Sequence, residues 1–135
     1  MDDIYLHIAR ARAKTIQGGC VTATGYSGKV QGLGKKRLNS AASIFRNYLD
    51  ELTPNQGSGG KTAFTCAEPK VILDALNNGA TPESINLYQI KCKREDRAPC
   101  QAWCSQYLSP SPNGAGYVID DDVIDHIYKH MPRYR

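Results

Sequence analysis

The sequence has no apolar run long enough to cross a membrane, and it is poor in tryptophan, phenylalanine, methionine and histidine. No apolar stretch approaches the roughly 18 residues that a spanning helix requires, and the mean hydropathy of the chain is -0.48. The acidic start, Met1-Asp2-Asp3, does not lead into the basic and apolar segments of a signal peptide. We therefore expect one soluble domain over residues 1–135, and a domain cut from a longer exported polypeptide would look the same.

The five cysteines are an odd number, so they cannot all be paired in disulfide bonds. An incomplete framework of this kind favours reduced thiols and a cytosolic site of action. The net charge is +4 and the isoelectric point is about 8.8. This basic balance is compatible with a polyanionic partner but does not require one.

Three of the cysteines stand at spacings typical of a metal site. Cys66 precedes Glu68 by two positions, and Cys100 precedes Cys104 by four. Three thiolates suit Zn²⁺, and a site with three protein ligands leaves a position for water, as catalytic zinc sites do. A fourth ligand, such as Cys92 or a histidine, would make it a structural site instead, and this alternative stays open.

The hydrophobic pattern predicts helices that alternate with strands. The first helix would begin at Asp2 or Asp3 and end before Gly18. Further helices are expected over residues 40–52, with Ser40 as the cap, and over residues 66–78, 100–108 and 120–131. Strands are expected over residues 20–26, 85–92 and 117–119, and a hairpin would pair the first of them with residues 29–31. Segments 53–60 and 109–116 have the composition of loops, and the alternation predicts an α/β fold.

Both cysteine motifs fall at the starts of predicted helices. At such positions the helix dipole and the free N–H groups favour thiolate over thiol, and so favour metal binding. Cys100 and Cys104 would lie on one face of their helix, because residues four apart are neighbours there.

These residues resemble the signature of the zinc-dependent cytidine deaminase-like superfamily, in which a His-x-Glu or Cys-x-Glu motif is followed by Pro-Cys-x2-Cys. The step of 31 positions from Glu68 to Pro99 also fits the way that the superfamily connects its motifs. The Cys-Ala-Glu-Pro-Lys form looks most like the deaminase domains at the C-termini of bacterial polymorphic toxins, including the YwqJ-like group. This chain departs from the pattern in its Cys-x3-Cys spacing and in having one predicted strand after the second motif, where the superfamily usually has two.

The resemblance implies a three-layer α/β/α sandwich with a mixed central sheet and an N-terminal hairpin. It assigns Zn²⁺ binding to Cys66, Cys100 and Cys104. It assigns proton transfer to Glu68, and it makes the backbone carbonyl of Ala98 the acceptor for the departing amino group. The implied reaction is the hydrolytic conversion of cytosine to uracil.

Candidate substrate-binding residues lie near the two motifs. Lys93, Arg94 and Arg97 lie in the segment that leads into the second motif, where they either hold phosphates or form a solvated surface. Phe64 and Trp103 either stack on a base or pack in the core. We therefore expect a polynucleotide substrate, DNA rather than RNA, with single strands favoured because no base has to be extruded.

The resemblance implies further that the domain is a bacterial toxin. It would act in the cytosol of a target cell, have a cognate immunity protein as a partner and make no membrane contact. Two alternatives stay open. A deaminase of free nucleosides or nucleotides would need a closed pocket, often completed by oligomer neighbours, whereas a non-catalytic zinc-stabilised binding module would have no use for Glu68.

Overall fold

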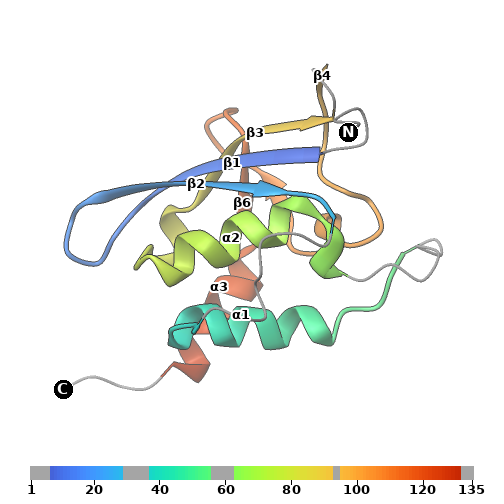
Figure 1. Cartoon of the computed structure of the whole chain (residues 1–135). Helices are drawn as coiled ribbons and strands as arrows, with labels where there is room; N and C mark the ends of the chain where they lie inside the picture. The colour runs from blue at the N-terminus through green and yellow to red at the C-terminus, as the bar shows by residue number, and fades with distance from the viewer. Residues whose placement is uncertain (1–6, 29–36, 56–62, 93–94, 132–135) are drawn as a thin grey trace.

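The computed structural model describes residues 7–28, 37–55, 63–92 and 95–131, in which a six-stranded sheet carries helices against one face (Figure 1). The strands are β1 (His7–Lys14), β2 (Cys20–Tyr26), β3 (Asn86–Cys92), β4 (Glu95–Asp96), β5 (Leu108–Pro110) and β6 (Tyr117–Ile119). The helices are α1 (Ser40–Asp50), α2 (Ala67–Asn77) and α3 (Asp121–His130), with short 3-10 turns η2 (Ala63–Thr65), η3 (Pro82–Ser84) and η4 (Cys104–Gln106).

The strand order is β2-β1-β3-β6-β5, with β4 paired to β3, and each of these pairings is antiparallel. The predicted α/β class is confirmed, but the predicted mixed sheet is wrong. A mixed sheet needs parallel neighbours, which are joined by crossover connections. Here the neighbouring strands run in opposite directions instead.

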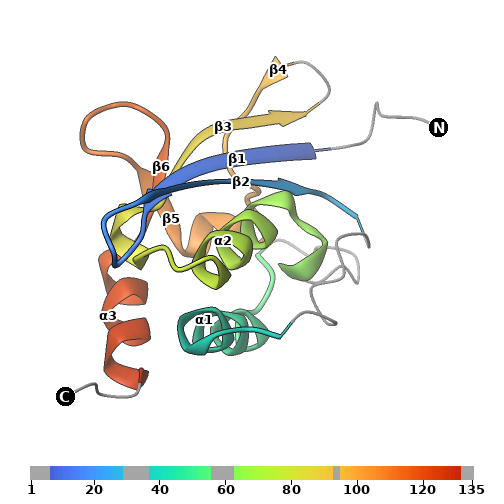
Figure 2. The same ribbon diagram turned by 60° about the vertical axis from the view of Figure 1, so that its left-hand side comes forward.

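The helices gather on one side of the sheet. α2 packs against β1 and β2, α1 packs on α2, and α3 packs on α1. Figures 1 and 2 show all three helices on the same side. Among the described residues no helix covers the other face, so the three-layer sandwich is not confirmed. None of the described helices is long and apolar enough to span a membrane.

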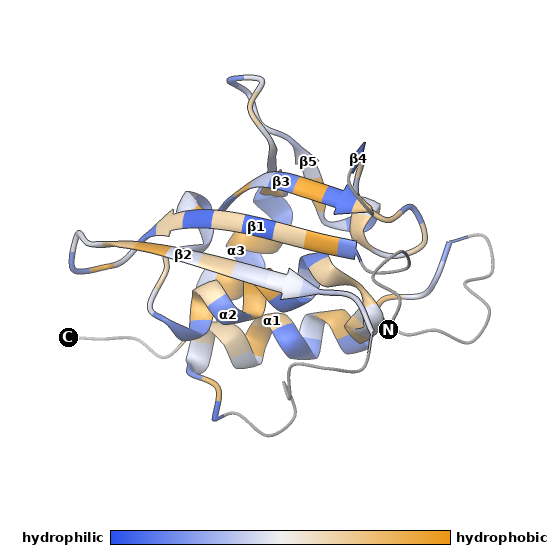
Figure 3. Ribbon diagram, turned by 45° about the horizontal axis from the view of Figure 1, so that its top comes forward, coloured by the Kyte–Doolittle hydropathy of each residue, from blue (hydrophilic) through white to orange (hydrophobic). Residues whose placement is uncertain are grey.

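The first described element is a strand, so the helix predicted before Gly18 is wrong. Ala9, Ala11 and Ala13 of β1 are buried, and they alternate with basic residues along the strand (Figure 3). This period of two is the pattern of a strand with one covered face. The helical spacing of Ile8 and Ala11 and the high helix propensity of alanine and arginine favour a helix locally, but pairing with two neighbouring strands overrides them.

The N-terminal hairpin is formed by β1 and β2, whose pairing runs from Ile8 with Tyr26 to Lys14 with Cys20. The strand predicted over residues 20–26 is confirmed. Its partner precedes it in the chain instead of following it, so the predicted hairpin is wrong in its pairing. The predicted second arm, residues 29–31, lies outside the described residues.

Two strands follow the second cysteine motif, where one was expected. Segment 109–116, predicted to be a loop throughout, begins within β5, and β5 pairs with β6 from Leu108 with Ile119 to Pro110 with Tyr117. Pro110 ends the strand at the edge of the sheet, where a missing N–H is tolerated. The prolines and glycines of this segment therefore mark a turn between two strands.

The remaining elements lie close to their predicted positions. β3, β6, α1, α2 and α3 correspond to the segments expected over residues 85–92, 117–119, 40–52, 66–78 and 120–131. α1 is capped by Asn39 instead of Ser40, because the Asn39 side chain accepts a hydrogen bond from the Ala42 N–H at 2.9 Å. Gly79 ends α2 as predicted, with a φ of +95° that favours glycine.

Gly25 of β2 allows the start of α2 to approach the sheet closely. A side-chain carbon at this position would lie 2.5 Å from the carbonyl oxygen of Ala67 and 2.7 Å from the backbone nitrogen of Val71. Both contacts are with helix backbone, which cannot rotate away as a side chain can. The glycine therefore sets the distance between β2 and the helix end that carries Glu68.

Gly25→Ala is expected to destabilise the fold by about 1–3 kcal/mol, because the added methyl group must displace the helix. Thr22→Ala, on the exposed side of the same strand, is the control, and its effect should stay within about 1 kcal/mol. Urea denaturation of the two variants measures the difference. Equal midpoints would show that α2 moves freely and that the close approach has no energetic role.

Candidate metal centre

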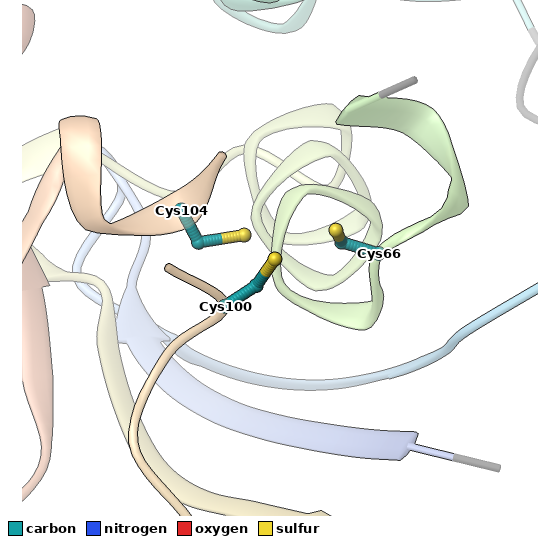
Figure 4. Close-up of side chains that lie close together, drawn as sticks. All are labelled: Cys66, Cys100 and Cys104. Atoms are coloured by element: carbon teal, nitrogen blue, oxygen red, sulfur yellow. The ribbon is translucent and has the colours of Figure 1, made fainter. Parts of the chain in front are cut away.

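The structure brings together the three cysteines that the sequence predicts to bind a metal. The sulfur atoms of Cys66, Cys100 and Cys104 all lie within 4.8 Å of one another (Figure 4). Cys104 is buried, and the other two are half-buried. Three thiols from segments far apart in the chain thus lie close enough to bind one metal ion.

Two different local structures present these thiols. Cys66 is the N-cap residue of α2, as predicted. The predicted helix over residues 100–108 is wrong, because Cys100 lies in an irregular segment and Cys104 begins η4. The N–H of Ser105 donates to the carbonyl of Cys100 at 2.9 Å, so the chain makes a wider turn than an α-helix. This turn, together with the departure into β5, replaces the helix.

Glu68 lies next to the three cysteines but is not one of the candidate metal ligands. Its side chain is 2% exposed, and its Oε2 accepts a hydrogen bond from the Cys100 N–H at 3.0 Å. Burial raises the pKa of this carboxyl, and the Cys100 N–H opposes the rise. A buried carboxyl fixed beside a candidate ligand is suited to accept and return a proton.

The three thiols change one another's pKa values through their mutual hydrogen bonds. Hydrogen bonds from Cys104 and Cys66 lower the pKa of Cys100 far below its usual range. The hydrogen bond to Cys100 raises the pKa of Cys66 to about 12, and burial raises the pKa of Cys104 well above its ordinary value. The contacts among the three thiols thus favour the thiolate form of Cys100, which is the form that binds a metal ion.

The donor set and its geometry fit Zn²⁺. Thiolates bound to one tetrahedral zinc ion at about 2.3 Å lie about 3.8 Å apart, so a small contraction of the group would accommodate the ion. No further histidine, cysteine or carboxylate joins the group within residues 7–28, 37–55, 63–92 and 95–131. Cys92, the alternative fourth ligand, is not a member. Three protein ligands are the number found in catalytic zinc sites.

Arg97 and Ala98 lie beside the centre. The half-buried Arg97 contacts the His7 ring at 2.8 Å through Nη1, and its Nε donates to the Ala98 carbonyl at 3.0 Å. A carbonyl oxygen has two lone pairs, so the Ala98 oxygen can accept a second hydrogen bond. A surface hollow of about 460 Å³ is lined by both residues together with Pro99 and Gln101, which flank Cys100 in the sequence.

The two predicted aromatic residues are placed differently. Trp103 is 6% exposed and belongs to the core, and its Nε1 is buried with no hydrogen-bond partner among the described residues. Phe64 is half-buried in η2, with the guanidinium carbon of Arg46 5.1 Å from its ring centroid. Lys93 and Arg94 lie outside the described residues.

Lys70 has a role that the sequence does not predict. It is 2% exposed in α2, and its ammonium donates to the carbonyl of Tyr26 at 2.9 Å and to that of Gly28. The Gly28 N–H in turn donates to the Thr65 carbonyl at 2.9 Å. These bonds tie the end of β2 to the segment that carries Cys66. A lysine directly before the apolar run from Val71 is the sequence signal for such a buried cation.

Tyr107 supports the metal centre from within the core. It is fully buried, and its hydroxyl donates to the Cys104 sulfur at 3.3 Å. Its ring meets that of Phe45 edge to face, with 5.4 Å between the centroids. Burial raises the pKa of Tyr107 well above its ordinary value, so the hydroxyl remains a neutral donor. The sequence suggests a core residue here but not its hydrogen bond to a candidate ligand.

Tyr107→Phe is expected to weaken metal affinity by about 10- to 100-fold, because it removes a donor that orients a ligand. Competition with a zinc chelator measures the change. Tyr48→Phe is the control, since Tyr48 stacks on Phe45 at a distance from the thiols. Equal zinc affinities for both variants would show that Tyr107 only fills the core.

Comparisons with protein-family models, curated proteins and solved structures gave no match for this chain. The fold and the site therefore define it as a mixed α/β protein with a three-thiol group able to bind a metal ion.

Proposed function

We propose that the protein is a zinc-dependent deaminase that converts cytosine to uracil in a polynucleotide. The observation that carries the proposal is the placement of Glu68. Its buried carboxyl touches the backbone of Cys100 but stands outside the group of three thiols. A structural zinc site has no need for such a carboxyl, whereas a hydrolytic site needs a residue that transfers protons.

When bound, Zn²⁺ supplies an electrophilic centre at which water becomes a nucleophile near neutral pH. Glu68 accepts a proton from the attacking water and gives it to the ring nitrogen of cytosine. The water oxygen forms a bond to C4, and the exocyclic amino group leaves as ammonia with a second proton. The Ala98 carbonyl accepts a hydrogen bond from that amino group as it departs. Cytosine and water thus become uracil and ammonia.

The resemblance to the cytidine deaminase-like superfamily supports this reaction. The second strand after the cysteine motif removes one departure from the superfamily pattern, and the wide turn accommodates the extra residue between Cys100 and Cys104. The three-layer sandwich remains an expectation from the same resemblance. Three further expectations also rest on this resemblance: a role as a bacterial toxin, delivery to a target cell and an immunity protein as partner.

A polynucleotide substrate is favoured by the cationic surface next to the second cysteine motif. The hollow lined by Pro99 and Gln101 lies at the surface, next to the cationic side chain of Arg97. A free nucleoside needs an enclosing pocket, whereas a base within a strand is held by contacts to its neighbours and its phosphates. We favour single-stranded DNA as the substrate.

Sequencing of DNA and RNA from cells that express the protein and lack uracil repair tests this proposal. Changes from C·G to T·A in DNA are expected for the parent, and cells that express Cys104→Ala should remain at background. Changes found only in RNA would show that the substrate is RNA instead of DNA. Unaltered DNA and RNA, with zinc-loaded protein present in the cells, would count against a polynucleotide substrate.

A further inference from the structure

The sheet face opposite α2, called here the open face, is not covered by any described helix (Figures 1 and 2). Antiparallel sheets often present one face to water, so exposure alone indicates no function. The composition of this face is what distinguishes it.

The open face carries a row of basic side chains on β1. The alanines of β1 are buried on the α2 side, so the alternate residues Arg10, Arg12 and Lys14 lie on the open face. Lys91 of β3 pairs with the residue two positions before Arg10 and shares its face. Asp96 of β4 pairs with Lys91 and brings an acidic group to the same face. The described cations of these strands therefore outnumber the acid.

A β-bulge turns an aromatic ring onto the open face. Arg10 pairs with Gln89, but the next residue of β1 pairs with Leu87, so Tyr88 is the extra residue. Tyr88 is 38% exposed, and the guanidinium carbon of Arg12 lies 4.1 Å from its ring centroid. Arg10 is also fixed, because its Nη1 donates to the Gln89 side chain at 2.7 Å. A stacked arginine–tyrosine pair thus stands within the basic row.

A second exposed aromatic residue lies on the same face. Tyr26 of β2 pairs with Ile8, which alternates with buried Ala9, and it is 37% exposed. By contrast, the first turn of α3 on the helix side is acidic, with Asp121 and Asp122. The last turn of the same helix is basic, with Lys129 and His130, so what distinguishes the open face is that its cations lie beside exposed aromatic rings.

The open face adjoins the segment that leads into the second cysteine motif. A surface hollow of about 470 Å³ is lined by Tyr88 and Gln89 on one side and by Arg97 and Ala98 on another. Arg97 and Ala98 also line the second hollow, together with Pro99 and Gln101, which flank Cys100 in the sequence. A ligand on the open face can therefore reach the segment that directly precedes Cys100 in the chain.

We propose that the open face binds single-stranded nucleic acid. Basic side chains attract phosphates, and aromatic rings and guanidinium planes stack on bases, so their combination is typical of single-strand binding surfaces. Phosphates lie along Arg10, Arg12 and Lys14, and a base stacks on the Arg12–Tyr88 pair. The idea that the bound strand presents a cytosine for deamination rests on the proposed function. Binding of the strand to the open face does not require turnover.

The test is the binding of a fluorescent single-stranded DNA oligonucleotide at several salt concentrations. Zinc-loaded Glu68→Gln protein is used throughout, so that the oligonucleotide is not consumed. In this background Arg10→Thr, Arg12→Thr and Lys14→Thr are combined, because threonine retains strand propensity. Tyr88→Thr is made separately. Lys129→Gln, in the last turn of α3, is the control on the helix side.

The triple variant is expected to bind at least tenfold more weakly. The slope of the logarithm of its binding constant against the logarithm of the salt concentration should become shallower by about 2, because each phosphate contact on a single strand contributes about 0.7. Tyr88→Thr should weaken binding by about tenfold without changing the slope, because it removes stacking and no charge. Lys129→Gln should match the parent.

Unchanged affinity and slope in the triple variant, with the circular dichroism spectrum of the parent, would overturn the proposal. So would poly-glutamate bound as tightly as the oligonucleotide, since that result would indicate an acidic protein as the partner. Deamination of the oligonucleotide by the unsubstituted protein, with Glu68 intact, separates the two claims. If the unsubstituted protein deaminates the oligonucleotide and the triple variant still binds it normally, only the inference about the open face fails. If the open face binds the oligonucleotide but no deamination occurs, the inference stands and the proposed function is wrong.

Discussion

Glu68→Gln is expected to lower turnover by about 10²- to 10⁴-fold, because the amide cannot take a proton from water. The substitution preserves shape, and the amide oxygen can still accept the hydrogen bond that the Cys100 N–H donates to Glu68. Zinc content and thermal stability should therefore remain close to those of the parent. Ammonia release from a cytosine-containing oligonucleotide measures turnover.

The matched control for this substitution is Glu83→Gln. Glu83 is exposed in η3 and accepts a hydrogen bond from the Tyr128 hydroxyl, away from the thiols. Turnover by this control should equal that of the parent. If Glu68→Gln retained turnover within about tenfold of the parent, proton transfer by Glu68 would be excluded as the main catalytic contribution.

Cys100→Ser is expected to remove the metal from the protein. Freshly purified parent should contain one Zn²⁺ per chain, since three thiolates form a tight zinc site at neutral pH. A serine hydroxyl is a poor zinc ligand, and two thiols are too few to hold the ion through purification. Because metal binding is coupled to folding, the variant should also lose thermal stability.

Elemental analysis by mass spectrometry measures the zinc content of tag-free protein. Cys20→Ser is the control, because Cys20 is exposed and lies outside the group of three thiols. Its zinc content should equal that of the parent. Equal zinc in Cys100→Ser and the parent would place the metal elsewhere, and parent protein without zinc would contradict the metal centre.

The candidate site could be predicted from the sequence because each of its two motifs is local. The Cys66 and Glu68 pair lies at the start of a strongly apolar helix, and α2 forms where that pattern places it. The approach of Cys100 and Cys104 was also predicted, but for the wrong reason. A turn closed by the bond between Ser105 and Cys100, and not a helix, brings them together.

The fold was less predictable where tertiary pairing decides the structure. The alanine and arginine residues of β1 have a high helix propensity. They form a strand because β1 pairs with two neighbouring strands of the sheet. The bulge that turns Tyr88 outward depends on the register between β1 and β3. Neither the register nor the uncovered face follows from local patterns, so the open face could be recognised only after the strands had been placed.

The most direct measurement is the mass of a single-stranded DNA oligonucleotide with one cytosine after incubation with purified, zinc-loaded protein. The predicted result is replacement of the amino group by oxygen, with the mass of the uracil product, for the parent and not for Glu68→Gln. An unchanged mass for single-stranded DNA, double-stranded DNA and RNA, with zinc shown to be bound throughout, would contradict the proposed function.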